Sequence, residues 1–108
     1  MGARRWNLSV VADGEVPSEA LADLCRRYQV RELSLFGSAA RGTMREDSDI
    51  DLLVEFEVGA NVGLVRFHQM QEDLEGLFGR RVDLVSKRGL NPAIRDVVLS
   101  EARVLHAA

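Results

Sequence analysis

Apolar side chains recur along this chain with a helical period in three stretches. After Pro17 they fall at i, i+3, i+4 and i+7, at Leu21, Leu24, Cys25 and Tyr28, and this spacing predicts an amphipathic helix. The same spacing predicts a second helix from Leu64 to Leu77. Gly79 should end it, because glycine is typical of helix ends. A closing helix is predicted after an Asn91 cap and Pro92, with one face formed by Ile94, Val97, Val98 and Leu105.

Three shorter stretches have the composition and period of strands. Residues 32–36, Glu-Leu-Ser-Leu-Phe, are typical of a short alternating or fully buried strand that stops at a Gly-Ser pair. Residues 81–86, Arg-Val-Asp-Leu-Val-Ser, predict a third strand. Residues 49–57 alternate acidic and apolar side chains with a period of two, which is the clearest strand signal in the chain. The predicted order is α-β-turn-β-α-β-α. The fold class is therefore α/β or α+β, with the helices packed on one face of a sheet.

No repeat, low-complexity tract or linker divides the chain, so residues 17–108 are predicted to form one domain. Residues 1–16 are an N-terminal extension. Within it, Trp6, Leu8 and Val10 alternate with polar residues, as in a short edge strand, but Asp13-Gly14 is a turn signal soon afterwards.

Composition narrows the class of protein further. With 108 residues, 46% hydrophobic and 29% charged, the chain has the composition of an ordinary globular domain. The single cysteine cannot form an internal disulfide, and no apolar run approaches the roughly 18 residues of a membrane span. A cytoplasmic location without membrane contact is expected. The net charge of −3 argues against extended nucleic acid as a ligand but is compatible with a single nucleotide and its metal.

Candidate chemistry lies where the central strand begins. Asp49 and Asp51 would share one strand face, about 6–7 Å apart, and Asp83 would join them if its strand is a neighbour. Clustered carboxylates need a counter-ion, and Mg²⁺ prefers their oxygen ligands and leaves room for phosphates. The turn at Gly37 and Ser38 would offer backbone N–H groups to a phosphate. These parts are typical of phosphoryl or nucleotidyl transfer.

Two segments carry a family resemblance: residues 35–42, Leu-Phe-Gly-Ser-Ala-Ala-Arg-Gly, and residues 47–54, Asp-Ser-Asp-Ile-Asp-Leu-Leu-Val. Together they resemble the minimal nucleotidyltransferase (MNT) family of the DNA polymerase beta superfamily, which implies a small mixed sheet. Val82-Asp83-Leu84-Val85 is similar to the third acidic strand of that family. The resemblance extends over about residues 18 to 106.

The resemblance implies a role for each matching residue. Gly37 and Ser38 would hold the nucleoside triphosphate, and Asp49 and Asp51 would bind Mg²⁺. Asp83 would complete the metal site and help to activate the acceptor hydroxyl. Minimal members are typically paired with a small helical HEPN protein, a toxin of the RNase type. The resemblance therefore implies an antitoxin that transfers AMP from ATP to a tyrosine of that partner.

Alternatives remain open from the sequence. A non-catalytic nucleotide-binding module would neutralise its partner by binding alone, and an unrelated α/β domain with an acidic face is a third reading. Glu55 shares the carboxylate face but would lie about 13 Å beyond Asp51, so we interpret it as solvated. Arg41 is compatible with either a phosphate contact or a solvated position. No residue pattern specifies the base of the nucleotide, the acceptor or a homo-oligomer.

Overall fold

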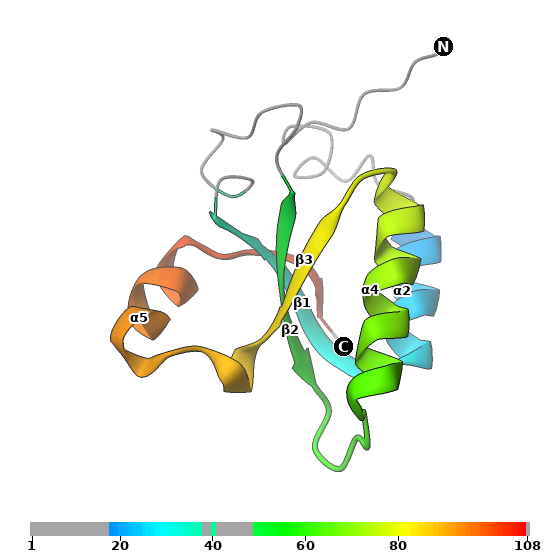
Figure 1. The fold of residues 1–108 in the computed structure, drawn as a ribbon, viewed down its shortest axis with the longest axis horizontal. Helices are drawn as coiled ribbons and strands as arrows, with labels where there is room; N and C mark the ends of the chain where they lie inside the picture. The colour runs from blue at the N-terminus through cyan, green and yellow to red at the C-terminus, as the bar shows by residue number, and fades with distance from the viewer. Residues whose placement is uncertain (1–17, 38–39, 41–48, 108) are drawn as a thin grey trace.

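A computed structural model describes residues 18–37, 40 and 49–107 of the chain. Within these residues the elements follow in the order α2 (Ser18–Arg27), β1 (Val30–Phe36), β2 (Ile50–Phe56), α4 (Leu64–Phe78), β3 (Val82–Ser86), the 3₁₀ turn η1 (Lys87–Gly89), α5 (Pro92–Glu101) and β4 (Arg103–Ala107). The strands lie in the order β3-β2-β1-β4 (Figure 1). β1 is antiparallel to both neighbours and β2 is parallel to β3. The predicted small mixed sheet is confirmed.

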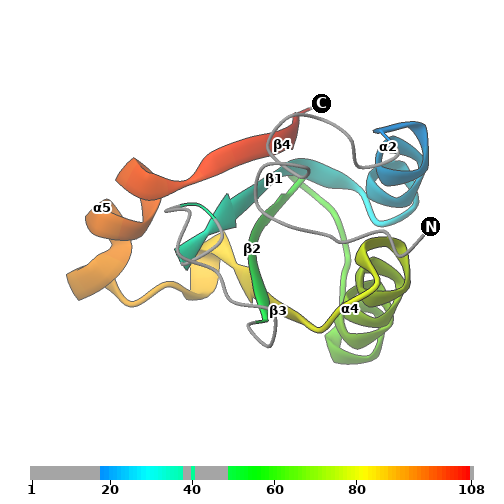
Figure 2. The ribbon, with the colours of Figure 1, turned by 90° about the horizontal axis from the view of Figure 1, so that it is seen from above.

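The hydrophobic core lies between the sheet and the helices α2 and α4, which cover one of its faces (Figure 2). Alternation along β2 explains why this face is apolar, since Ile50, Leu52 and Val54 are fully buried against the helices. The predicted apolar face of α2 is confirmed, with Leu21, Leu24 and Cys25 buried. On α4 Met70 and Leu74 are buried as predicted, whereas Leu64, predicted on the same face, is 80% exposed. Burial raises the pKa of the Cys25 thiol to about 11, so this group stays protonated at neutral pH.

Polar contacts join the end of α2 to α4. Tyr28 follows α2, and its hydroxyl donates a hydrogen bond of 2.6 Å to the carboxylate of Asp73 in α4. Arg66 of α4 lies over the Tyr28 ring, 4.6 Å from its centroid, and donates to the carbonyl oxygen of Arg27. Burial, followed by the contact with Asp73, raises the pKa of Tyr28. The two helices therefore cover the sheet as a connected layer.

The C-terminal part of the chain differs from the prediction. α5 ends at Glu101, and Leu105 lies in β4 rather than on a closing helix. β4 pairs with β1 and so satisfies backbone groups that β1 would otherwise present at an open edge. Because β3 and β4 are the two outer strands, the segment between them has to cross the sheet. In Figures 1 and 2, α5 lies on the side of the sheet opposite α2 and α4, whereas the prediction had every helix on one face.

Local signals at the helix ends behave as predicted. The Asn91 side chain caps α5 by accepting a hydrogen bond of 2.9 Å from the N–H of Ala93, with Pro92 as the first helical residue. Gly79 ends α4 in the left-handed conformation, with φ of 71°. The suggested edge strand at residues 6–10 lies outside the described residues. Among the residues that the structure describes, no helix is both long and apolar enough to cross a membrane.

A pair of leucines in α4 tests the position of the core. Leu74 is fully buried and Leu64 is 80% exposed. Leu74→Ala should lower the free energy of unfolding by about 2–5 kcal/mol, because the side chain leaves a cavity in the core. Leu64→Ala should change it by less than about 0.5 kcal/mol. Urea unfolding followed by circular dichroism measures both, and equal effects would contradict this packing.

Candidate active site

The backbone of Gly37 lies directly against the carboxylate of Asp51. Gly37 follows the last residue of β1, has a φ of +68°, and has no Cβ. A Cβ built at this position would overlap Oδ2 of Asp51 and lie 3.2 Å from its Cγ. Both the positive φ and this close approach require glycine. Gly37 of the predicted turn is therefore in direct contact with Asp51 of the predicted acidic strand.

Strand register explains this contact and adds a second carboxylate. Phe36, the residue before Gly37, is opposite Asp51 in the antiparallel pair of β1 and β2. Asp51 is in turn opposite Asp83 in the parallel pair of β2 and β3. Since the next residues, Leu52 and Leu84, are both buried in the core, the two aspartates lie on the other face of the sheet. Asp51 is half-buried there and Asp83 is exposed.

Asp49 lies just before β2 and contacts a cation of the chain itself. Its Oδ1 is 3.7 Å from Nε of Arg81, the residue that precedes β3. The carbonyl oxygen of Arg81 also accepts a hydrogen bond of 2.9 Å from the N–H of Ile50, which joins the beginnings of the two strands. Arg81 was not identified from the sequence as a neighbour of Asp49.

The three aspartates do not form a closed metal cluster. In residues 18–37, 40 and 49–107 no group of three or more His, Cys, Asp or Glu side chains could hold a metal ion. The in-register pair of Asp51 and Asp83 nevertheless presents carboxylate oxygens, the donor type that Mg²⁺ takes. Ser38 and Arg41 lie outside the described residues. The metal and phosphate roles of the five site residues, Gly37, Ser38, Asp49, Asp51 and Asp83, stay predictions.

Glu75 of α4 holds the beginning of β3 and was not identified from the sequence. Its Oε2 accepts a hydrogen bond of 3.0 Å from the backbone N–H of Val82, the residue before Asp83. The contact connects the core layer to the strand that carries the third aspartate. A glutamate near the end of a helix is common in any sequence, so only the packing of α4 beside β3 reveals this role.

Comparison with known proteins identifies the class. A family model described as a nucleotidyltransferase domain matches residues 17–105. The chain therefore belongs to the nucleotidyltransferase family, and the enzyme class predicted from its Gly-Ser and Asp-X-Asp motifs is confirmed.

Individual relatives make the resemblance more specific. The chain is 47% identical over 79 residues to the protein adenylyltransferase MntA of Thermococcus cleftensis, covering 73% of this chain and 78% of that protein. A solved structure provisionally described as a minimal nucleotidyltransferase is 44% identical, with a TM-score of 0.74 over 94% of this chain and 97% of the other. A complex of the tri-AMPylated HEPN toxin of Shewanella oneidensis with its MNT antitoxin has a chain of similar fold, at 18% identity and a TM-score of 0.63 over 88% and 73% of the two chains. The resemblance to minimal nucleotidyltransferases is confirmed.

Two glycines test the contact with Asp51. Gly37→Ala should lower the free energy of unfolding by roughly 1–3 kcal/mol, because alanine is strained at a positive φ and its Cβ meets the carboxylate. Gly76 lies within α4 with open space around it, so Gly76→Ala should raise stability by about 0.5–1 kcal/mol. Urea unfolding compares the two. A neutral Gly37→Ala would contradict the close approach.

Hydrogen exchange tests the role of Glu75. Glu75→Ala should speed exchange of the Val82 amide roughly tenfold, because the N–H loses its acceptor. Glu75→Gln should restore most of the protection, since the amide oxygen also accepts. Glu72→Ala is the matched control, because that glutamate is exposed and contacts His68. NMR of the folded protein measures all three, and an unchanged Val82 rate in Glu75→Ala would refute the contact.

Proposed function

We propose that this nucleotidyltransferase is a Mg²⁺-dependent protein adenylyltransferase that transfers AMP from ATP to a tyrosine hydroxyl of a HEPN partner and thereby acts as its antitoxin. The observation that carries the proposal is the contact of the Gly37 backbone with the Asp51 carboxylate, in register with Asp83. This contact supports a phosphate-binding role for Gly37, whose backbone lies beside acidic oxygens where β1 ends and β2 begins. The names of the MntA relative and of the AMPylated HEPN complex support the nucleotide and the partner.

Asp49, Asp51 and Asp83 would hold Mg²⁺, which would neutralise charge on the α-phosphate and on departing pyrophosphate. Gly37 and Ser38 would bind the β- and γ-phosphates through the turn after β1. The acceptor oxygen attacks the α-phosphorus, and the bond from that phosphorus to the bridging oxygen of pyrophosphate breaks. Asp83, which is exposed, takes the proton of the hydroxyl.

Domain boundaries and location complete the proposal. Residues 17–108 form the catalytic domain, which the family match over residues 17–105 supports, and residues 1–16 are an extension. We keep a cytoplasmic location, because the single Cys25 is free and buried as an unpaired thiol.

A second candidate is a module that neutralises its partner by binding alone. It is favoured by one observation, that no three acidic side chains of the described residues converge on a metal position. The two candidates differ in whether neutralisation of the HEPN partner requires the carboxylates of Asp49 and Asp51.

Substitution of the Asp-X-Asp pair separates these candidates. The variant Asp49→Asn with Asp51→Asn should abolish AMP transfer, a loss of at least about 100-fold, because amides cannot replace the charged metal ligands. Intact mass spectrometry of a HEPN partner, after incubation with this chain, ATP and Mg²⁺, detects the added AMP. Partner binding should persist in the variant.

Asp96→Asn is the control, since this exposed aspartate lies on α5, away from the candidate edge. It should transfer AMP at the rate of the unmodified protein. Full neutralisation by the double variant without any AMP on the partner would instead establish the binding module.

A further inference from the structure

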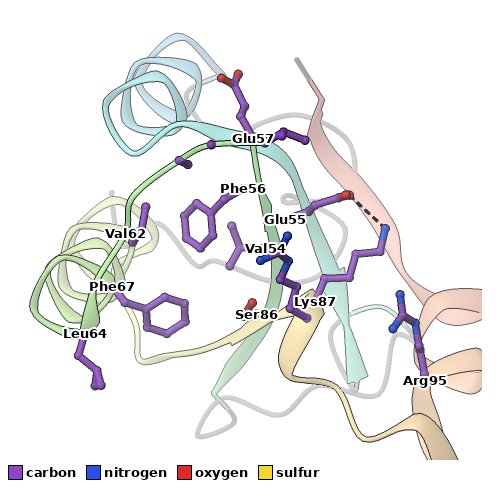
Figure 3. A pocket seen from close by; sticks show the side chains of 15 residues that line it. Val54, Glu55, Phe56, Glu57, Val62, Leu64, Phe67, Ser86, Lys87 and Arg95 are labelled. Atoms are coloured by element: carbon purple, nitrogen blue, oxygen red, sulfur yellow. Dashed lines mark hydrogen bonds and ion pairs between the residues drawn. The ribbon is translucent and has the colours of Figure 1, made fainter.

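A second candidate site lies at the opposite end of the sheet from Gly37 and Asp51. A cavity of about 820 Å³ opens between the ends of β2 and β3, the connection of residues 57–63, and the first turns of α4 and α5. Figure 3 shows this cavity with Phe56 and Phe67 beside one another, Leu64 at the helix end and Arg95 on the α5 side. The strand from Asp51 to Phe56 separates it from the candidate active site by roughly 16 Å. Neither the motifs nor the proposed chemistry use this region.

One side of the cavity is apolar and open. Val58, Leu64 and Val65 are 93%, 80% and 75% exposed, and the first two line the cavity. Behind them Phe56 and Phe67 form an edge-to-face pair, with ring centroids 6.3 Å apart. Large aliphatic side chains exposed together next to aromatic rings are typical of a protein-binding surface.

The other side of the cavity is cationic. Lys87 is neutralised within the chain, because its Nζ lies 3.2 Å from Glu55 and 3.7 Å from Glu32. This ion pair also corrects the interpretation of Glu55 as a solvated residue, since Lys87 of η1 binds its carboxylate. A side chain from a distant segment cannot be inferred from strand spacing alone.

Two further cations on this side have no counter-charge among the described residues. Arg88 and Arg95 both line the cavity, and neither makes an ion pair or hydrogen bond within the part of the chain that the structure describes. Glu57 directs its carboxylate away from the cavity (Figure 3). The cavity therefore combines an apolar wall with two available guanidinium groups, in a chain whose net charge is −3.

We propose that this cavity is a docking site for a segment of the HEPN partner in which an apolar side chain is flanked by carboxylates. The apolar side chain would pack on Phe56 and Phe67 between Val58 and Leu64. The carboxylates would pair with Arg88 and Arg95, which are suited to bidentate contacts. Arginine and aromatic groups are also the residue types that contribute most to binding at protein interfaces.

A second copy of this chain fits the cavity less well. A two-fold symmetric contact would bring the Arg88 and Arg95 guanidinium groups of both copies into one interface, where their like charges would repel. A nucleotide is also disfavoured, because Val58 and Leu64 on the aliphatic rim are 93% and 80% exposed, whereas a base is usually held in a largely buried pocket. A polypeptide with acidic and apolar side chains complements both the cationic and the apolar side of the cavity.

This inference rests on the proposed function, because it assigns a surface to the same partner. The separation from Asp51 gives it a consequence for catalysis. A partner held at this end of the sheet leaves the edge at Gly37 open for the nucleotide and the acceptor tyrosine. Binding energy from a remote contact can then position the acceptor for reaction.

Isothermal titration of the full chain with the HEPN partner that it adenylylates tests the docking site. Arg88→Glu with Arg95→Glu should weaken binding at least roughly tenfold, because both guanidinium contacts become repulsive. Leu64→Ser should weaken it independently, and because Leu64 is 80% exposed the variant should fold normally. ATP affinity should stay unchanged in both variants. The matched control, Arg31→Glu with Val104→Ser, alters an exposed arginine and an exposed valine outside the cavity and should bind as the unmodified chain does.

Each outcome separates this inference from the proposed function. Unchanged binding in both cavity variants would overturn the docking site while AMP transfer to the partner continued. Weaker binding of the control alone would also overturn it and place the interface on β1 and β4. Loss of a dimer of this chain in the cavity variants, detected by sedimentation, would overturn it in favour of a second copy. Failure of the unmodified chain to bind the HEPN protein would overturn both proposals.

Discussion

The antiparallel register of β1 with β2 sets the position of Gly37 beside Asp51 at the candidate active site. It places Phe36 opposite Asp51, so that the next residue, Gly37, lies against the Asp51 carboxylate. Side chains alternate along a strand, and a shift by one residue would turn Asp51 into the core and Leu52 out to solvent. Burial of Ile50, Leu52 and Val54 against α2 and α4 fixes this register. The same apolar packing that stabilises the fold thus also positions the polar edge.

Helix α4 connects this core to the third aspartate. Its inner face contributes Met70, Leu74 and Phe78 to the core, while Glu75 accepts a hydrogen bond from the beginning of β3. Because β3 is parallel to β2, holding its first residue determines which residue lies opposite Asp51. An edge strand has only one neighbour in the sheet, so a side-chain contact from the adjacent helix restrains an end that would otherwise be free to fray.

The two ends of β2 differ in charge and in what they can bind. Acidic side chains lie at the beginning of β2. There they would bind a metal ion, which in turn would bind the negatively charged triphosphate. At the other end of β2 the apolar rim and two arginines would complement a protein segment with an apolar side chain and carboxylates. A strand of seven residues is long enough to keep these surfaces apart and rigid enough to hold their spacing. Such a separation would allow the proposed partner binding and AMP transfer to proceed on one small domain.

Sequence alone determined the class of fold, the helices and strands up to residue 101 within a few residues, and the family, because periodicity and the Gly-Ser and Asp-X-Asp motifs are local signals. It did not determine β4, because residues 103–107 carry no alternation strong enough to outweigh a continuing helix, and only the open edge of β1 makes them a strand. Nor did it reveal the contacts of Glu75, Arg81 and Lys87, which join residues distant in sequence or depend on how strands and helices pack. Residue spacing specifies which face a side chain occupies, and only the tertiary structure decides which neighbour meets it there.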